Sequence, residues 1–301
     1  HTRVIGGVAG QTTVMSTTYD DVDRPLTVTI TPEDSSAHTA TYTYDGEFAK
    51  TLALTGFGQI VTDVDYNHRR QLTSIKRDGS DPDTTLTYHP QGEGFRLSEI
   101  RHGNATDALP DFVYGGYDNL GNLQQVTTKR WAEQDAQTFE YDGVSRLTSA
   151  SSPGTTGIPA YDYDYSYGPG GNLSTRVNNL SGQTRSYVYG TVANHHIHAV
   201  MSITGEGPKD TFGYDNNGNM LSRKIDDVSY TQEFDVENRL TKVTKGSQVT
   251  GFYYDADGNR TLTIYGTGTS EVKVYTPFPD FEESIPAGGT VTQRTSYTLA
   301  G

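Results

Sequence analysis

The sequence predicts an all-β protein built from tandem β-hairpins. Three observations lead to this prediction: a composition rich in strand formers, apolar and polar residues that alternate with a period of two, and an aromatic residue that recurs at a regular spacing. Among 301 residues there are 21 tyrosines and 43 threonines, and aromatic and β-branched side chains favour strands. Disordered chains are poor in both types, so the hydrophobic content of 33% does not predict disorder.

The alternation is clearest in two segments. In Thr39–Tyr44 the threonines fall on one face of the expected strand, while Ala40, Tyr42 and Tyr44 fall on the other. The segment Tyr161–Tyr167 places four tyrosines on one face in the same way. Gly, Pro, Asn and Asp interrupt the chain every ten residues or so, and no window of a dozen residues carries a convincing helical stripe. Short strands joined by turns are therefore expected throughout.

An aromatic residue, usually followed by Asp, marks an internal repeat. The gaps between successive members range from 20 to 29 residues and average about 23. About 23 residues hold two short strands and two connections, so each repeat is expected to be one hairpin. In chain order the members are Tyr19, Tyr44, Tyr66, Tyr88, Tyr117, Tyr141, Tyr167, Tyr189, Tyr214, Phe234, Tyr254, Tyr275 and Tyr297.

The best-formed repeats share the pattern aromatic-Asp-x-x-Gly-Asn. We expect the strand to end at the aromatic residue, the Asp side chain to cap backbone N–H groups, and Gly to supply a positive φ. Leu and Thr then open the returning strand, as at Leu147-Thr148 and Leu240-Thr241. The residues assigned to this structural motif are Tyr117, Asp118, Gly121, Asn122, Tyr141, Asp142, Tyr214, Asp215, Gly218, Asn219, Phe234, Asp235, Tyr254, Asp255, Gly258 and Asn259.

These motifs, together with the variant Phe234–Val243 and the segment His198–Val200, resemble the YD-repeat or RHS-repeat family. The resemblance covers essentially the whole chain. It is strongest between Tyr117 and Tyr265, and the turn consensus is lost in residues 46–58, 91–96 and 277–286. Family members include bacterial polymorphic toxins, the shell component of insecticidal toxin complexes, and teneurins.

The resemblance implies a β-sheet that coils as hairpins are added, giving a shell or solenoid. In the bacterial toxins the shell encloses a C-terminal toxic domain, which a core region after the repeats releases by aspartate-dependent self-cleavage. This sequence departs from that pattern, because its one Asp-Pro, Asp81-Pro82, lacks the core motif. We therefore expect residues 1–301 to form a single array of about twelve repeats, with the downstream core and cargo domain absent.

Composition excludes several functions. The chain has 37 acidic and 23 basic residues, whereas binding a nucleic-acid backbone requires clustered cations. Without cysteine there is no thiolate ligand or nucleophile. No apolar stretch approaches the roughly 20 residues of a membrane-spanning helix. We expect no nucleic-acid partner, no membrane span and no cofactor.

The His, Asp and Glu residues that could form a chemical site are better explained by structural roles in turns and strands. His195, His196 and His198 could offer two imidazoles on one strand face, but a metal needs further converging ligands. The segment Asp255–Asn259 begins like a calcium loop yet lacks the closing Glu, and turn capping explains Asp215, Asp255 and Asp257 equally well. The pairs Asp226-Asp227 and Glu282-Glu283 are adjacent residues, which point to opposite faces of a strand. We expect no catalytic and no metal site.

Three non-catalytic functions are preferred, and a glycan lyase or hydrolase on a β scaffold is kept as an outside alternative. The preferred one is a segment of a secreted or cell-surface RHS shell, bacterial by resemblance, that encapsulates or presents a C-terminal toxin or effector of its parent chain. A second is a self-assembling extracellular filament or tube, in which identical subunits join through exposed strand edges. A third is an adhesion module that binds glycans on the Tyr161–Tyr167 face.

Overall fold

The computed structural model describes residues 2–6, 12–32, 35–79, 82–103, 109–130, 133–191 and 197–298. Its described elements are strands and two short 3₁₀ helices, η1 (Gln91–Glu93) and η3 (Gly268–Ser270), so the all-β prediction is confirmed. Neither helix approaches the length or apolarity that crossing a membrane demands. The chain divides into unit 1 (residues 1–42, 54–56 and 187–300) and unit 2 (residues 43–53 and 57–186).

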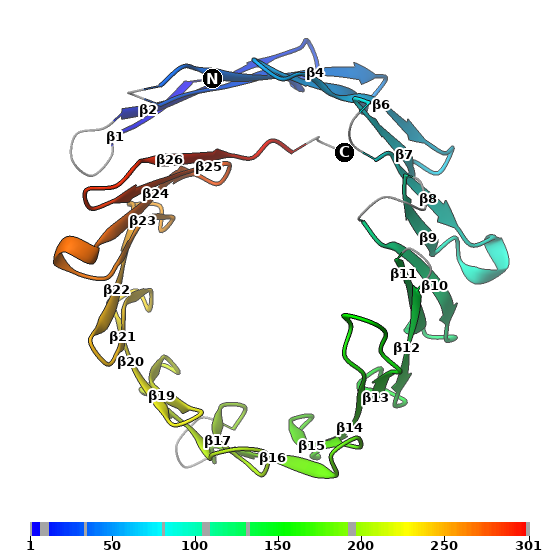
Figure 1. Cartoon of the computed structure of the whole chain (residues 1–301), viewed down its shortest axis with the longest axis vertical. Coiled ribbons are helices and arrows are strands. Elements are labelled where there is room, and N and C mark those ends of the chain that lie inside the picture. The colour runs from blue at the N-terminus through cyan, green and yellow to red at the C-terminus, as the bar shows by residue number, and fades with distance from the viewer. Residues whose placement is uncertain are drawn as a thin grey trace. The chain divides into compact units, whose positions relative to one another are not determined.

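The strands follow one another along the chain, as Figure 1 shows. The first half comprises β1 (Thr2–Gly6), β2 (Thr12–Tyr19), β3 (Pro25–Thr31), β4 (His38–Asp45), β5 (Phe48–Leu54), β6 (Gly58–Tyr66), β7 (Leu72–Arg77), β8 (Thr84–Tyr88), β9 (Leu97–His102), β10 (Asp111–Tyr117), β11 (Leu123–Arg130), β12 (Glu133–Tyr141) and β13 (Leu147–Ser152). The second half comprises β14 (Tyr161–Tyr167), β15 (Leu173–Asn178), β16 (Gln183–Tyr189), β17 (Val200–Thr204), β18 (Asp210–Tyr214), β19 (Met220–Ile225), β20 (Val228–Phe234), β21 (Leu240–Lys245), β22 (Gln248–Tyr254), β23 (Arg260–Tyr265), β24 (Val272–Phe278), β25 (Phe281–Pro286) and β26 (Thr292–Thr295).

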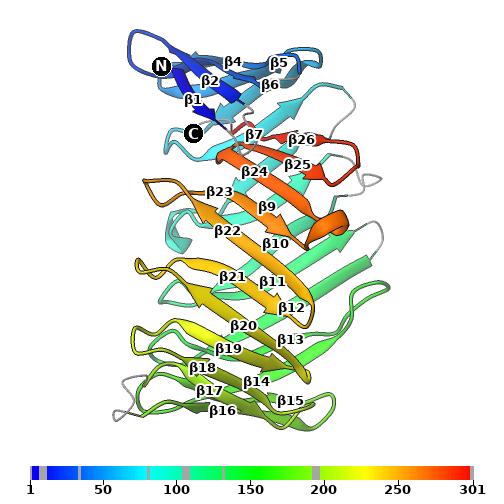
Figure 2. The same ribbon diagram turned by 90° about the vertical axis from the view of Figure 1, so that its left-hand side faces the viewer.

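Within each unit, the strand pairings that the structure describes join consecutive strands and are antiparallel. In unit 1 the strands from β17 to β25 lie side by side with their turns at the two sides (Figure 2). Most repeat aromatics end an even-numbered strand, as Tyr117 ends β10 and Phe234 ends β20. One hairpin therefore occupies one sequence repeat.

The two sides of the hairpins differ in their connections. On the side where even-numbered strands end, here called the motif side, eight connections are five-residue turns with one shared hydrogen-bond pattern. On the opposite side, here called the loop side, connections range from two residues between β19 and β20 to eight residues between β13 and β14. The eight turns span residues 20–24, 67–71, 118–122, 142–146, 168–172, 215–219, 235–239 and 255–259.

A β-bulge accompanies the consensus aromatics. Tyr141 pairs with Leu147 while Glu140 pairs with Ser149, so Thr148 is an extra residue on the returning strand. Such a bulge bends the strand and increases its right-handed twist. The same register shift occurs at Tyr19, Tyr66, Tyr88, Tyr117, Tyr167, Tyr214, Phe234 and Tyr254.

An apolar core in unit 1 joins strands from far apart in the sequence. Met15 of β2 pairs with Ile30 of β3, and Phe278 of β24 pairs with Phe281 of β25. The two pairs pack against each other, and Figure 1 shows β24 to β26 beside β2. We call these four residues the end stack. The Ser35 hydroxyl also donates to Gln293 Oε1 at 3.0 Å.

Candidate functional site

Six of the eight five-residue turns on the motif side are built around one carboxylate. In the turn 118–122, Asp118 Oδ1 accepts hydrogen bonds from the backbone N–H of Leu120 at 2.9 Å and of Asn122 at 2.8 Å. Gly121 has φ +93°, in the region that glycine adopts without strain. The Asp-capping and the positive φ expected from the sequence are both present here. The same Asp geometry recurs at Asp20, Asp142, Asp215, Asp235 and Asp255.

Two chemistries complete this turn. In one version the last residue is Asn, and Asn219 Nδ2 donates to Asp215 Oδ2 at 2.9 Å. In the other it is Arg, and Arg239 Nε donates to Asp235 Oδ2 at 2.7 Å. The Arg version also occurs at Arg24 and Arg146, each with a Nε to Oδ2 distance of 2.7 Å. The motif predicted from the sequence does not include the Arg version, although Arg follows Asp by four residues in all three of these turns.

The motif tyrosines join one hairpin to its neighbour. Tyr117 Oη donates to the Leu97 carbonyl at 2.9 Å, and Tyr254 Oη donates to the Leu240 carbonyl at 2.8 Å. In each case the acceptor opens the adjacent strand. Tyr88, Tyr167 and Tyr214 make the same bond to Leu72, Leu147 and Val200. Burial raises the pKa of Tyr88, Tyr117 and Tyr214, since a phenolate is poorly solvated there.

Neighbouring turns also touch directly. Asn122 Nδ2 donates to the Ser145 hydroxyl of the next turn at 3.0 Å, and Asn219 Nδ2 donates to Asn238 Oδ1 at 2.7 Å. The Arg239 guanidinium lies 5.0 Å from the centre of the Tyr254 ring, within cation–π range. The motif residues thus connect repeat to repeat, and any further role for them stays a prediction.

Hydrogen bonds to these carboxylates stabilise their charged form. The Asn122 side chain lowers the pKa of Asp118, and the Arg239 backbone N–H lowers that of Asp235. In unit 2 a separate cluster has the same effect, because hydrogen bonds first from Lys50 and then from Lys76 lower the pKa of Asp63 to about 2. Carboxylates held in this way serve as structural anions.

A row of aromatic and cationic side chains crosses four strands of unit 1. Phe212 of β18 pairs with Arg223 of β19, Arg223 with Tyr230 of β20, and Tyr230 with Lys245 of β21. Directly paired residues share one face of a sheet, so these four side chains form one row, here called the basic–aromatic row. The Arg223 guanidinium lies 4.7 Å and Lys245 Nζ 5.6 Å from the centre of the Tyr230 ring.

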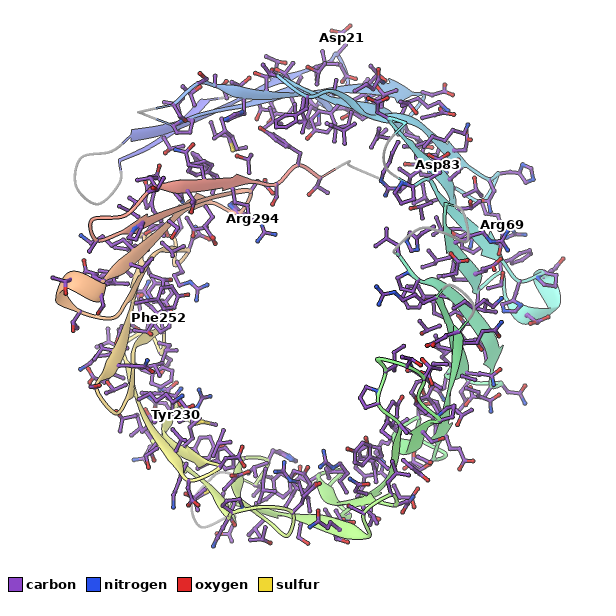
Figure 3. The ribbon with its side chains drawn as sticks, in the orientation of Figure 1. Asp21, Arg69, Asp83, Tyr230, Phe252 and Arg294 are labelled. Carbon is purple, nitrogen blue, oxygen red and sulfur yellow. The ribbon has the colours of Figure 1, made fainter. Side chains whose placement is uncertain are left out.

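The same face continues onto β22. Gln232, two residues after Tyr230, pairs with Val243, and Val243 pairs with Thr250, which places Phe252 on this face as well. Figure 3 shows Tyr230 and Phe252 on the inner side of the bend that β18 to β22 make within unit 1. On this face Arg223, Tyr230 and Phe252 are half-buried, whereas Lys245 is exposed, as are Thr231 and Tyr253 on the opposite face.

Three tyrosines of β14 form a row of neighbouring rings in unit 2, stacked between Tyr161 and Tyr163 and tilted between Tyr163 and Tyr165. The ring centres of Tyr161 and Tyr163 are 6.0 Å apart and those of Tyr163 and Tyr165 are 6.4 Å apart. The Arg176 guanidinium lies 4.6 Å from the Tyr163 ring centre. Tyr167 serves the motif instead, since its hydroxyl donates to the Leu147 carbonyl. Contacts within the sheet therefore occupy this group, and glycan binding stays an untested alternative.

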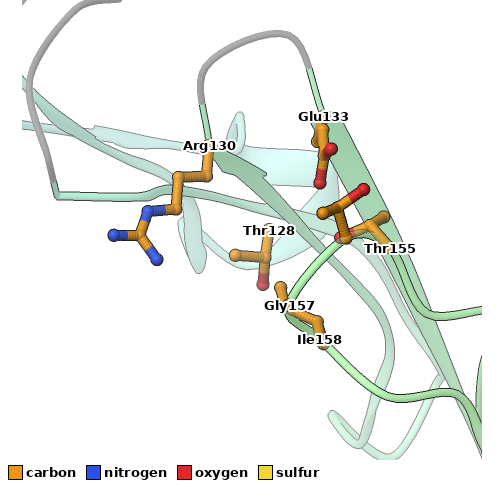
Figure 4. Close-up of a pocket in the computed structure, with 7 residues that line it drawn as sticks. Thr128, Arg130, Glu133, Thr155, Gly157 and Ile158 are labelled. Atoms are coloured by element: carbon orange, nitrogen blue, oxygen red, sulfur yellow. The ribbon is translucent and has the colours of Figure 1, made fainter.

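A shallow hollow in unit 2 lies between the β11–β12 hairpin and the loop 153–160 (Figure 4). Beneath that loop, the Asp135 carboxylate is 1% exposed and accepts from Ser152 Oγ at 2.6 Å and from the Gly154 N–H at 3.1 Å. Gln137 Nε2 donates to its other oxygen at 3.2 Å. Asp135 thus anchors the loop, and this explains a buried carboxylate that the sequence analysis did not single out.

The other His, Asp and Glu residues considered in the sequence do not form a common site. His195 and His196 lie outside the described residues. Asp226 and Asp227 form the two-residue turn between β19 and β20, both with positive φ. Glu283 is buried and accepts from Gln293 Nε2 at 2.8 Å, while Glu282 pairs across from Arg294. Within the part of the chain that the structure describes, three or more His, Asp or Glu side chains nowhere gather as metal ligands do.

Comparison with known proteins identifies the fold. No family model matches the chain, and no curated protein sequence matches it. Among solved structures, a TcdB2-TccC3-Cdc42 structure is similar with a TM-score of 0.71 and 18% identity over 95% of this chain. A TcdB2-TccC3 structure without the hypervariable C-terminal region gives 0.69 and 18% over 96%. The chain spans about 15% of the length of each of these two structures.

Proposed function

Because the chain has the fold of the YD/RHS-repeat shells, we propose that it is a non-catalytic segment of a shell that encloses or presents a polypeptide of its own parent protein. The likeness to toxin-complex chains supports a structural, shell-like role. Secretion or display at the cell surface belongs to the same proposal. The recurring acidic groups are the turn aspartates, and their carboxylates cap backbone N–H groups.

One observation carries the proposal: the inner face of the β18–β22 bend in unit 1. Tyr230, Gln232 and Phe252 are half-buried there. The exposed side chains of the opposite face include Ser222, Ser229, Thr231, Glu233 and Tyr253. In an antiparallel sheet the less exposed face ordinarily packs on a second layer. The basic–aromatic row thus has the composition of a surface that contacts another polypeptide, where aromatics and Arg are enriched.

Site-specific photo-crosslinking in the full parent protein tests this proposal. A photoreactive side chain at Thr250, on the inner face, is expected to couple to a distant segment of the same protein. The matched position is Lys242, on the opposite face of the neighbouring strand, since it pairs with Gly251. Equal crosslinking at both positions, or none at Thr250, contradicts enclosure.

Light scattering over a concentration series, followed by negative-stain electron microscopy, separates the shell from the filament. The proposal predicts discrete particles whose mass does not grow with concentration. Uniform fibres that lengthen with concentration would make self-assembly the function.

A further inference from the structure

Strands β19 and β21 of unit 1 carry cations on both faces. The cations on one face form ion pairs with carboxylates, and those on the other face contact an aromatic ring. On the face opposite the basic–aromatic row, Lys224 Nζ lies 2.7 Å from Asp227 Oδ1, and Lys242 Nζ lies 2.8 Å from Glu233 Oε1. In the row itself, Arg223 and Lys245 both lie over the Tyr230 ring. Among the described residues, neither of these two cations has a carboxylate partner, in a chain with net charge −14.

The residues that flank this pair along β20 and β21 are uncharged, and the nearest described carboxylate on the same face, the buried Asp210 of β18, accepts from the Asp226 N–H. Gln232 and Val228 flank Tyr230 along β20, and Val243 precedes Lys245 on the same face of β21. Arg223 is half-buried, whereas Lys245 is exposed. The pair attracts an anion most strongly at Arg223, because the local dielectric there screens the charge less than water does.

Two polar atoms on this face lack a hydrogen-bond partner within the described residues. They are the donor Arg223 Nε and the acceptor Gln232 Oε1. Buried polar atoms are rarely left unpaired, because each costs free energy without a partner. A ligand that satisfies both must offer an acceptor to Arg223 and a donor to Gln232.

We propose that the basic–aromatic row binds an acidic, extended segment of polypeptide. Carboxylates pair with Arg223 and Lys245, a backbone N–H donates to Gln232 Oε1, and the chain lies over the Tyr230 ring. The two cations lie two strands apart, about 9 to 10 Å. Side chains on one face of an extended peptide recur about every 6.6 Å, and long Arg and Lys side chains span the difference. This proposal rests on the proposed function and names the chemistry of the enclosed segment.

A polypeptide fits better than a polyphosphate. Phosphate groups satisfy Arg223 and Lys245, but when ionised they offer only acceptors and leave Gln232 Oε1 unpaired. A peptide supplies carboxylates and N–H donors together.

Fluorescence anisotropy with a labelled peptide of alternating Glu and Thr tests the proposal on the 301-residue chain. Binding is expected at low salt and should weaken as salt rises. The double variant R223Q/K245Q is expected to bind at least about tenfold more weakly, because charge-assisted hydrogen bonds are the strong ones. The matched control K224Q/K242Q changes the net charge by the same amount on the opposite face and is expected to stay within about twofold of the unchanged chain.

A single variant gives a second test in case the double variant R223Q/K245Q misfolds. Gln232→Leu removes the unpaired acceptor without touching a charge, and we expect it to weaken peptide binding a few-fold while circular dichroism stays unchanged. Equal weakening by both double variants, or no binding to the unchanged chain, overturns the proposal. So does polyphosphate that binds with the same dependence on Arg223 and Lys245 and on Gln232.

The two proposals fail in different ways. A crosslink at Thr250 without any affinity for the acidic peptide keeps the enclosing role and rejects an acidic segment. Peptide binding without a crosslink in the parent protein shows a competent surface and rejects enclosure.

Discussion

Two regions of unit 1 are stabilised by different means. In the end stack, the exposed fractions of Ile30, Phe281 and Phe278 are 0%, 1% and 2%, because two layers of strands meet there. In β18 to β22 the aromatic side chains remain half-exposed, and neighbouring repeats are joined by capped turns and tyrosine hydroxyls. The repeat can therefore form a stable sheet without a continuous apolar core, as expected when each unit contacts only its neighbours.

The two regions also differ in how far the effect of a lost contact extends. Loss of a contact in the end stack exposes apolar surface on strands from both halves of unit 1. Loss of one cap or hydroxyl affects a turn and the strand beside it. Mutations in the two regions are therefore expected to differ in size and in reach.

The largest effect is expected at Phe281. Phe281→Ala leaves a cavity between the two layers and should lower the free energy of unfolding by about 3–5 kcal/mol, measured by urea denaturation. The matched control is Phe57→Ala, because Phe57 is 72% exposed and its removal should be nearly neutral. A loss below about 1 kcal/mol at Phe281 would mean that the end stack contributes little.

A fall in pH is expected to lower stability by an intermediate amount, because acid protonates the carboxylates of the repeat turns. The pKa values of Asp118, Asp142 and Asp235 are lower in the folded chain than in an unfolded one. Their contribution is therefore complete above about pH 4 and is lost as the pH falls through the folded values. For Asp63, with a folded pKa of about 2, the loss extends between about pH 4 and pH 2. Unfolding midpoints measured from pH 5 to pH 2 check this dependence.

The variant Asp235→Asn assigns part of this acid effect to a turn. It should lower stability at neutral pH and flatten the dependence on pH below 4. Asp257→Asn is the control, since Asp257 is an exposed residue within a turn whose cap is Asp255. Identical acid profiles for Asp235→Asn and the unchanged chain would remove the capping carboxylate as the cause.

The smallest effect is expected at a single tyrosine hydroxyl. Tyr117→Phe removes the bond to the Leu97 carbonyl and should cost about 0.5–1.5 kcal/mol. Hydrogen exchange should show the loss confined to β9 and β10. Tyr253→Phe, at a residue 52% exposed, should change neither quantity. A loss spread over the whole unit would contradict local stabilisation.

The hairpin repeat and its turns were predictable from the sequence because they depend on local chemistry. Asp118 and Gly121 determine their turn within five residues, and the alternation in Tyr161–Tyr167 depends only on strand geometry. The predicted loss of the turn consensus also has a structural counterpart, since η1 replaces the five-residue turn after Tyr88 and β24 joins β25 through two residues.

The remaining features depend on contacts that no local pattern records. The end stack pairs Met15 and Ile30 with side chains about 250 residues away, and neither pair differs in sequence from an ordinary strand. The basic–aromatic row requires the register of four strands, which the bulges at Tyr214 and Phe234 shift by one residue. Asp135 was overlooked because its loop departs from the repeat.

The two kinds of connection tolerate inserted sequence differently. In the Asp-capped turns of the motif side, the five residues are tied by the carboxylate and by neighbouring turns, so an inserted residue breaks several bonds together. On the loop side, the connection varies from two to eight residues without changing the strand order. New sequence can therefore enter at positions such as Gly246 and Ser247, and the array can acquire displayed loops while its sheet stays constant.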